Sequence, residues 1–223
     1  MEIDPRVKYA IEHTEVVRLP RQNLATFGST FIYYYVVTAL TASVNVVREG
    51  NVIAERPRIV TPLYLTQVEG FSEQARSYLQ TMVAKNPNEP GIFYRYKNEA
   101  REMNVVPESM ANLLNKLNER ITKQNNPLST IIKGVEELWD VSLMLFIYEL
   151  TTKSLYDNIL DFQRRGALNI DSAGVPEDAR NFIEELFALA SRDISRAPEL
   201  VAELKKWGLF EEYQDRFFTL FRR

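Results

Sequence analysis

The stretch STFIYYYVVTAL, residues 29–40, is apolar on both faces of an extended chain. Successive side chains of a strand point to opposite sides, and here both sides carry aromatic or β-branched residues, the types enriched in strands. One side carries Phe31, Tyr33, Tyr35 and Val37, and the other carries Ile32, Tyr34 and Val36. A strand that is apolar on both faces has both faces covered. The stretch therefore predicts a central strand.

Further strands are predicted on either side of this stretch. Upstream, Thr14–Leu19 alternates apolar and polar residues and is followed by Pro20, which suits a short, half-buried strand. Downstream, Val44–Val47 and Val52–Val60 flank Arg48–Asn51, where glycine and asparagine can supply the positive φ angles of a tight turn. We therefore predict a β-hairpin that turns at residues 48–51.

The next segment predicts a helix followed by a second hairpin. Ser72 is a candidate N-cap for a helix with an apolar stripe, which Asn86 and Pro87 would end. Beyond it, Ile92–Lys97 and Glu102–Val106 have strand composition and are separated by three residues. We predict that these two strands form a hairpin across residues 98–100.

From Pro107 onward the apolar period changes from two residues to 3.6. Pro107 suits the first position of a helix, whose apolar face comprises Met110, Leu113, Leu114, Leu117 and Ile121. After a break at residues 125–127, the pattern predicts one long helix over Ser129–Arg165. Later helices are predicted to begin at Pro176 and after Pro198, and a short aromatic helix ends the sequence.

Together these elements predict an α+β protein. Its N-terminal part would be an antiparallel β-sheet of two hairpins with one helix between them, packed with a largely α-helical C-terminal half. The change of period places the division near residue 106, which separates a β-rich portion, 1–106, from a helical portion, 107–223. The two portions can also pack as one body.

Composition excludes several classes of site. The chain has no cysteine, so it has no disulfide framework, thiolate zinc site or cysteine nucleophile, and a reducing compartment is the default.

The first residues lack the basic and apolar order of a secretory signal, so we expect a cytoplasmic protein. A net charge of −3 gives no general attraction to nucleic acid or anionic lipid. The uncharged segment between Arg21 and Arg48 contains polar and strand-forming residues, so we expect a soluble protein rather than a membrane span.

Few residues suggest catalysis. The single histidine, His13, lacks the partners of a triad or a histidine metal site, and glycine-rich phosphate loops are absent. We therefore expect no cofactor and favour a protein that is not an enzyme. The alternative is a magnesium-dependent enzyme acting on a phosphorylated substrate, because Glu136 and Asp140 would share one helix face and carboxylates suit a hard cation.

Two groups of residues are candidates for binding. Tyr33 and Tyr35, with Arg95 and Glu149 as polar anchors, would line a small-molecule pocket between the sheet and the helices. At the C-terminus, Phe217, Phe218 and Phe221 would form an interface with another protein or a second copy.

Because reactive residues are scarce, the sequence favours a non-catalytic interaction or assembly protein that self-associates into a homo-oligomer. The small-molecule-binding protein with the tyrosine-lined pocket is the first alternative, and the magnesium-dependent enzyme is the second.

Overall fold

The computed structural model describes residues 4–61 and 91–221 of the 223-residue chain. It is an α+β protein made of two compact units, each formed by separate parts of the sequence. Unit 1 comprises residues 1–57 and 94–160, and unit 2 comprises residues 58–93 and 161–223. Both units therefore draw on residues from either side of position 106, where the change of period suggested a division.

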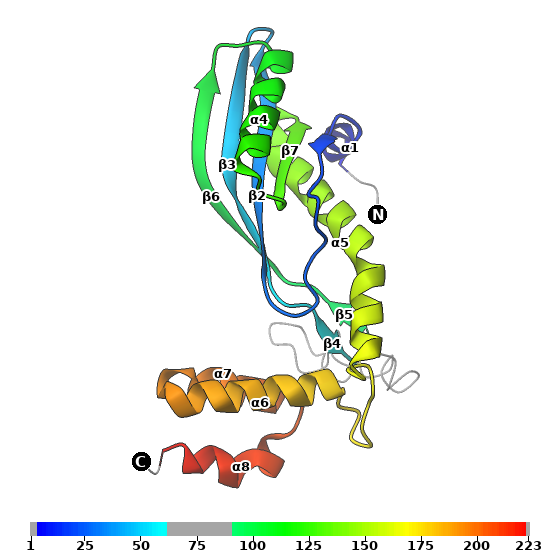
Figure 1. Cartoon of the computed structure of the whole chain (residues 1–223), viewed down its shortest axis with the longest axis vertical. Helices are drawn as coiled ribbons and strands as arrows, with labels where there is room; N and C mark the ends of the chain where they lie inside the picture. Colours follow the sequence, from blue (N-terminus) through cyan, green and yellow to red (C-terminus); the bar gives the residue numbers. More distant parts are fainter. Residues whose placement is uncertain (1–3, 62–90, 222–223) are drawn as a thin grey trace. The chain divides into compact units, whose positions relative to one another are not determined.

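Unit 1 is built around a five-stranded sheet in the order β1-β7-β2-β3-β6 (Figure 1). Its strands are β1 (Glu15–Arg18), β2 (Thr30–Thr41), β3 (Val44–Ala54), β6 (Tyr96–Val106) and β7 (Ser129–Gly134). The predicted central strand is confirmed, because β2 lies in the middle of the sheet. The predicted short strand before Pro20 is confirmed as β1.

Helices cover both faces of this sheet. The odd-numbered residues Tyr35 and Val37 of β2 pack with Leu113, Leu117 and Ile121 of α4 (Met110–Gln124). The even-numbered residues on the opposite face pack with Leu143, Phe146, Ile147 and Leu150 of α5 (Trp139–Arg164). Figure 1 shows α4 against one face and α5 along the other. This arrangement explains why β2 is apolar on both sides. A short N-terminal helix, α1 (Pro5–Glu12), precedes β1.

The predicted antiparallel sheet is wrong in one respect, because the sheet is mixed. Strand β7 comes from the half that was expected to be helical, and it pairs in parallel with β2 and antiparallel with β1. Its sequence, STIIKG, is a short apolar run with β-branched residues, and periodicity alone does not separate such a run from a buried helix. The predicted helix over Ser129–Arg165 is therefore a strand, a 3₁₀ turn at Glu136–Leu138 and helix α5.

The first predicted hairpin turns at a different place. Strand β3 runs straight through residues 48–51, and the tight connection from β2 to β3 lies at residues 42 and 43. Glycine is required at position 50 because Tyr34 and Glu99 approach its backbone closely, and not because the chain turns there. A Cβ there would overlap the ring of Tyr34 and would lie 2.7 Å from the carbonyl oxygen of Glu99.

The second predicted hairpin is also wrong. Residues 98–100 lie inside one continuous strand, β6, which pairs with β3. Strand β5 (Gly91–Phe93) pairs instead with β4 (Arg58–Val60) in a separate two-stranded sheet. Asn98 and Glu99 are polar and resemble a turn because β6 is an edge strand, exposed along most of its length. The helix predicted after Ser72 lies outside the described residues.

The described part of unit 2 contains three α-helices and the small sheet of β4 and β5. Helices α6 (Glu177–Arg192), α7 (Ala197–Lys206) and α8 (Phe210–Thr219) enclose a core that includes Ile183, Leu186, Leu200, Leu204 and Trp207. The small sheet is tied to them by Asp178, whose carboxylate accepts a hydrogen bond from the backbone N–H of Ile59 at 3.1 Å. Within residues 4–61 and 91–221, no helix combines the length and apolar character needed to cross a membrane.

Candidate functional site

A polar pocket opens on the sheet of unit 1 at the C-terminal end of α4. Its volume is about 420 Å³, which falls within the range of about 300–1,000 Å³ that is usual for small-molecule sites. Strands β2, β3 and β6, helix α4 and the residue two positions after α4 supply the lining, which is Tyr33, Tyr35, Glu49, Arg101, Glu102, Arg120, Gln124 and Asn126. We call these residues the sheet pocket.

The pocket exists because α4 is shorter than the strands beneath it. Leu113, Leu117 and Ile121 cover the sheet as far as Tyr35, which is 2% exposed. The helix then ends at Asn125, whose φ of 51° lies in the left-handed region that ends many helices. Tyr33, two residues before Tyr35 on the same face of β2, lies past this end and is half-buried.

A β-bulge shapes the edge of the pocket. Glu49 pairs with Glu102 and Gly50 pairs with Ala100, so Arg101 is an extra residue in β6 with no partner in β3. A bulge of this kind bends the strand and re-aims its side chains. The result is that two consecutive residues, Arg101 and Glu102, both line the pocket, although alternation along a regular strand would point them to opposite faces.

Two arginines lie over two tyrosines in this pocket. The guanidinium carbon of Arg101 is 4.8 Å from the centre of the Tyr33 ring, and that of Arg120 is 5.5 Å from the centre of the Tyr35 ring. Arg101 also donates a hydrogen bond to the hydroxyl of Tyr33. In the amide orientation that satisfies its neighbours, buried Asn51 accepts a hydrogen bond from Arg101 Nη2 at 2.7 Å. These contacts fix the position of both cations.

The tyrosine hydroxyls differ in their partners. None of the residues in the described part of the chain makes a hydrogen bond to the hydroxyl of Tyr35, although that residue is almost fully buried. Burial raises the pKa of Tyr35, while Arg120 opposes the rise and Glu49 adds to it. The hydroxyl therefore stays protonated at neutral pH and can donate a hydrogen bond to a molecule in the pocket.

The charges of the pocket balance, but they are not all paired. Arg120 Nη1 lies 3.2 Å from Glu49 Oε1 and forms an ion pair with it. Within residues 4–61 and 91–221, Arg101 and Glu102 form no ion pair with each other or with any other residue. The described residues thus leave one cation and one anion of the pocket, Arg101 and Glu102, without a charged partner.

The structure brings together two of the four residues that were predicted to bind a ligand. Tyr33 and Tyr35 line the pocket, whereas Arg95 forms an exposed ion pair with Glu55 at 3.5 Å. Glu149 is exposed on α5, which covers the opposite face of the sheet. Sequence reasoning missed Glu49, Arg101, Glu102 and Arg120. Only Arg120 had a signal, since it lies three residues after Leu117 of the apolar stripe of α4.

The two predicted magnesium ligands lie at the start of α5. Glu136 is in the 3₁₀ turn, and both of its carboxylate oxygens accept hydrogen bonds from Arg48, at 2.6 and 2.9 Å. The hydrogen bonds from Arg48 hold the pKa of Glu136 below its usual value, although burial opposes this effect. Asp140 is exposed in the first turn of α5. The described residues contain no group of three or more acidic, histidine or cysteine side chains arranged to hold a metal ion.

The three C-terminal phenylalanines differ in exposure. Phe217 is 7% exposed and packs in the core of unit 2, whereas Phe218 is 46% and Phe221 is 54% exposed. The rings of Phe218 and Phe221 each contact the ring of Phe217, with centroids 5.7 and 5.3 Å apart. Phe218 and Phe221 therefore form an exposed aromatic patch supported by a buried ring.

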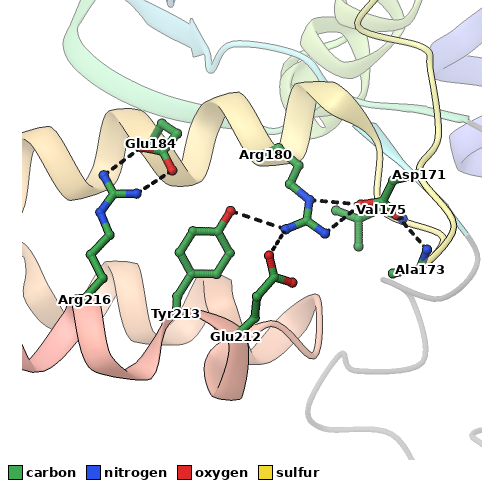
Figure 2. A network of polar contacts seen from close by, with 8 residues as sticks. All are labelled: Asp171, Ala173, Val175, Arg180, Glu184, Glu212, Tyr213 and Arg216. Carbon is green, nitrogen blue, oxygen red and sulfur yellow. Dashed lines mark hydrogen bonds and ion pairs between the residues drawn. The ribbon is translucent and has the colours of Figure 1, made fainter.

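Two arginines fix α8, the helix that carries Phe218 and that ends two residues before Phe221 (Figure 2). Arg216 of α8 donates two hydrogen bonds to the carboxylate of Glu184 on α6, at 2.6 and 2.7 Å. Arg180 of α6 donates to Glu212 of α8 at 2.6 Å and to the hydroxyl of Tyr213 at 3.3 Å. Its other nitrogens bind Asp171, which also accepts hydrogen bonds from two backbone N–H groups of its own loop. Such charge-assisted contacts hold α8 in one orientation on α6.

Comparison with protein-family models, with curated proteins and with solved structures found no match for this chain.

Proposed function

We propose that this chain is a non-catalytic protein that binds a small polar molecule in the sheet pocket. The proposal rests on one observation: Tyr35, an almost fully buried residue, lines a ligand-sized concavity, and its hydroxyl has no hydrogen-bond partner among the described residues. A ligand with an acceptor oxygen would form a hydrogen bond with this hydroxyl, which would contribute about 0.5–1.5 kcal/mol to binding.

The surroundings of Tyr35 support the same proposal. The arginines over the two tyrosine rings are held in place before any ligand arrives, so little side-chain freedom remains to be lost on binding. Gln124 and Asn126 add amide groups at the same opening. A rigid set of donors and acceptors around a concavity is typical of a specific polar binding site.

The test is a thermal-shift screen with pools of polar metabolites, followed by calorimetry on each hit. A ligand at about one hundred times its dissociation constant would add about 2.7 kcal/mol and raise the melting temperature by several degrees. The variant Tyr35→Phe keeps the ring under Arg120 but removes the hydroxyl, so it should weaken binding about tenfold.

The matched control is Tyr34→Phe. Tyr34 is the next residue of β2, is equally buried, and faces the opposite side of the sheet. Loss of the Tyr34 hydroxyl should leave ligand affinity within about twofold of wild type, because this hydroxyl lies outside the pocket. If no pool shifts the melting temperature, or if both variants bind the hit as wild type does, the proposed function is overturned.

A second function, self-association into a homo-oligomer, is supported by the exposed patch of Phe218 and Phe221. Exposed aromatic side chains on a rigid support are enriched at protein interfaces. The ion pairs of Arg180 and Arg216 keep α8 from rotating these rings into the core of unit 2.

Sedimentation velocity tests this second function at several protein concentrations. We expect the wild-type chain and Phe218→Leu to associate, and Phe218→Asp to remain monomeric, because a charge at the centre of the patch is costly to bury. Phe217→Asp is unsuitable here, since Phe217 is part of the core. A wild-type chain that is monomeric at high concentration would contradict self-association.

A further inference from the structure

The bulge in β6 leaves two opposite charges next to each other in the sheet pocket. Arg101 and Glu102 are consecutive, so their Cα atoms are about 3.8 Å apart. Both line the pocket, and no residue in the described part of the chain forms an ion pair with either of them. Arg120 and Glu49, the other two charged residues of the pocket, neutralise each other.

This distribution of charge selects a class of ligand. A simple anion would satisfy Arg101 and leave Glu102 without a counter-charge, and a simple cation would do the reverse. A molecule that carries one negative and one positive group close together would satisfy both. Because the two protein charges come from neighbouring residues that line one pocket, we expect the two charges of the ligand to lie close together as well.

From these observations we infer that the ligand of the sheet pocket is a free α-amino acid. Its carboxylate binds the guanidinium of Arg101, and its ammonium group binds the carboxylate of Glu102. One carboxylate oxygen also accepts a hydrogen bond from the hydroxyl of Tyr35, and the side chain of the amino acid occupies the remaining volume. This inference rests on the proposed function, since it names the ligand class of the same pocket.

The lining explains why both charges are available to a ligand. Arg101 is held by the Tyr33 hydroxyl and the Asn51 amide, which are neutral groups and leave its charge uncompensated. Glu102 lies directly opposite Glu49 on the neighbouring strand, so it sits beside a second carboxylate and favours a cation. A peptide would carry its terminal charges on different residues, so the short spacing favours the free amino acid.

The experiment is calorimetry with each of the twenty common L-amino acids. The tightest binder is then compared with two analogues, the same molecule without its amino group and the same molecule without its carboxyl group. We expect the amino acid to bind at least tenfold more tightly than either analogue. Glu102→Gln should bring the affinity for the amino acid to within about threefold of that for the deaminated analogue. Arg101→Gln should bring the affinity for the amino acid to within about threefold of that for the decarboxylated analogue.

Lys97→Gln and Glu99→Gln are the matched controls, because these residues lie on the same strand, pair with each other and are not part of the lining. Both control variants should keep the wild-type preference for the amino acid over its two analogues. If the analogues bind as tightly as the amino acid, or if Glu102→Gln and Arg101→Gln keep the preference, the amino-acid inference is wrong. If other metabolites bind in a manner that depends on Tyr35 while amino acids do not, only this inference fails. If nothing binds, the proposed function fails as well.

Discussion

Glu49 and Glu102 lie directly opposite each other on β3 and β6, and within the described ranges only Glu49 has a basic partner, Arg120. Two carboxylates at one cross-strand position repel each other. The structure keeps this unfavourable pair at the mouth of a pocket, where Glu102 also faces the solvent.

Glu102→Gln should stabilise the ligand-free protein. The substitution removes the repulsion from Glu49, and we expect the free energy of unfolding to rise by about 0.2–0.5 kcal/mol at neutral pH, a small value because Glu102 is exposed. Urea unfolding at low and high salt measures it. The gain should shrink in 1 M salt because salt screens the repulsion. A loss of stability at low salt would show that Glu102 has a favourable partner instead.

The two neighbouring tyrosines of β2 should respond differently to loss of the hydroxyl. The hydroxyl of Tyr34 donates to Asn98 at 3.0 Å, so Tyr34→Phe should lower the free energy of unfolding by about 1 kcal/mol. Tyr35→Phe removes a donor without a partner among the described residues, so it should leave stability unchanged or raise it slightly. Chemical denaturation of both variants measures the difference. Equal losses would mean that the Tyr35 hydroxyl has a structural partner.

Gly50→Ala should destabilise unit 1 by about 1–3 kcal/mol. A methyl group at this position overlaps the ring of Tyr34 and approaches the backbone of Glu99, and neither can move freely within the packed sheet. Chemical denaturation measures the loss. A variant as stable as the wild type would mean that β3 and Tyr34 are not in contact as described.

The ion pair of Arg48 and Glu136 should make stability depend on acid pH. Arg48 lowers the pKa of Glu136 in the folded state below its ordinary value of 4.5. The unfolded chain therefore takes up this proton first, so the contribution of the pair is complete above about pH 5 and declines as the pH falls through the lower, folded-state pKa. We expect Glu136→Gln to lose stability at pH 7 and to show a smaller further loss between pH 5 and pH 3 than the wild type does. An unchanged pH profile in this variant would contradict the assignment.

The C-terminal patch of unit 2 depends on the contact between α6 and α8. Arg216 lies 4.1 Å over the ring of Phe187 and binds Glu184 with two hydrogen bonds, which hold the pKa of Glu184 below its usual value. Arg216→Met should keep much of the packing but remove the charge pairing, and we expect it to lower stability by about 0.5–1 kcal/mol. Hydrogen exchange of the α8 amides measures the loss. Unchanged protection would mean that packing alone holds α8 in place.

The local sequence pattern was sufficient to predict the helices and strands in which residues of one kind recur at a regular spacing. Strand β2 was predictable because every residue from Phe31 to Val37 is aromatic or β-branched, and α4 because its leucines recur at helical spacing. The helices α6, α7 and α8 follow the same rule, with apolar stripes bounded by Pro176, Pro198 and Gly208. In each case the pattern that predicts the element is contained within a few helical turns or a single strand.

The sequence by itself determined the α+β class, the central strand and the tyrosines that line the pocket, because alternation and helical period are local properties. Only the tertiary structure decided the rest. Strand β7 joins the sheet through pairing with β2, which lies almost one hundred residues earlier in the chain. Arg101 enters the pocket because a mismatch of one residue between β3 and β6 makes a bulge. Such long-range pairings depend on which strands meet and in what register, and no local pattern encodes either one.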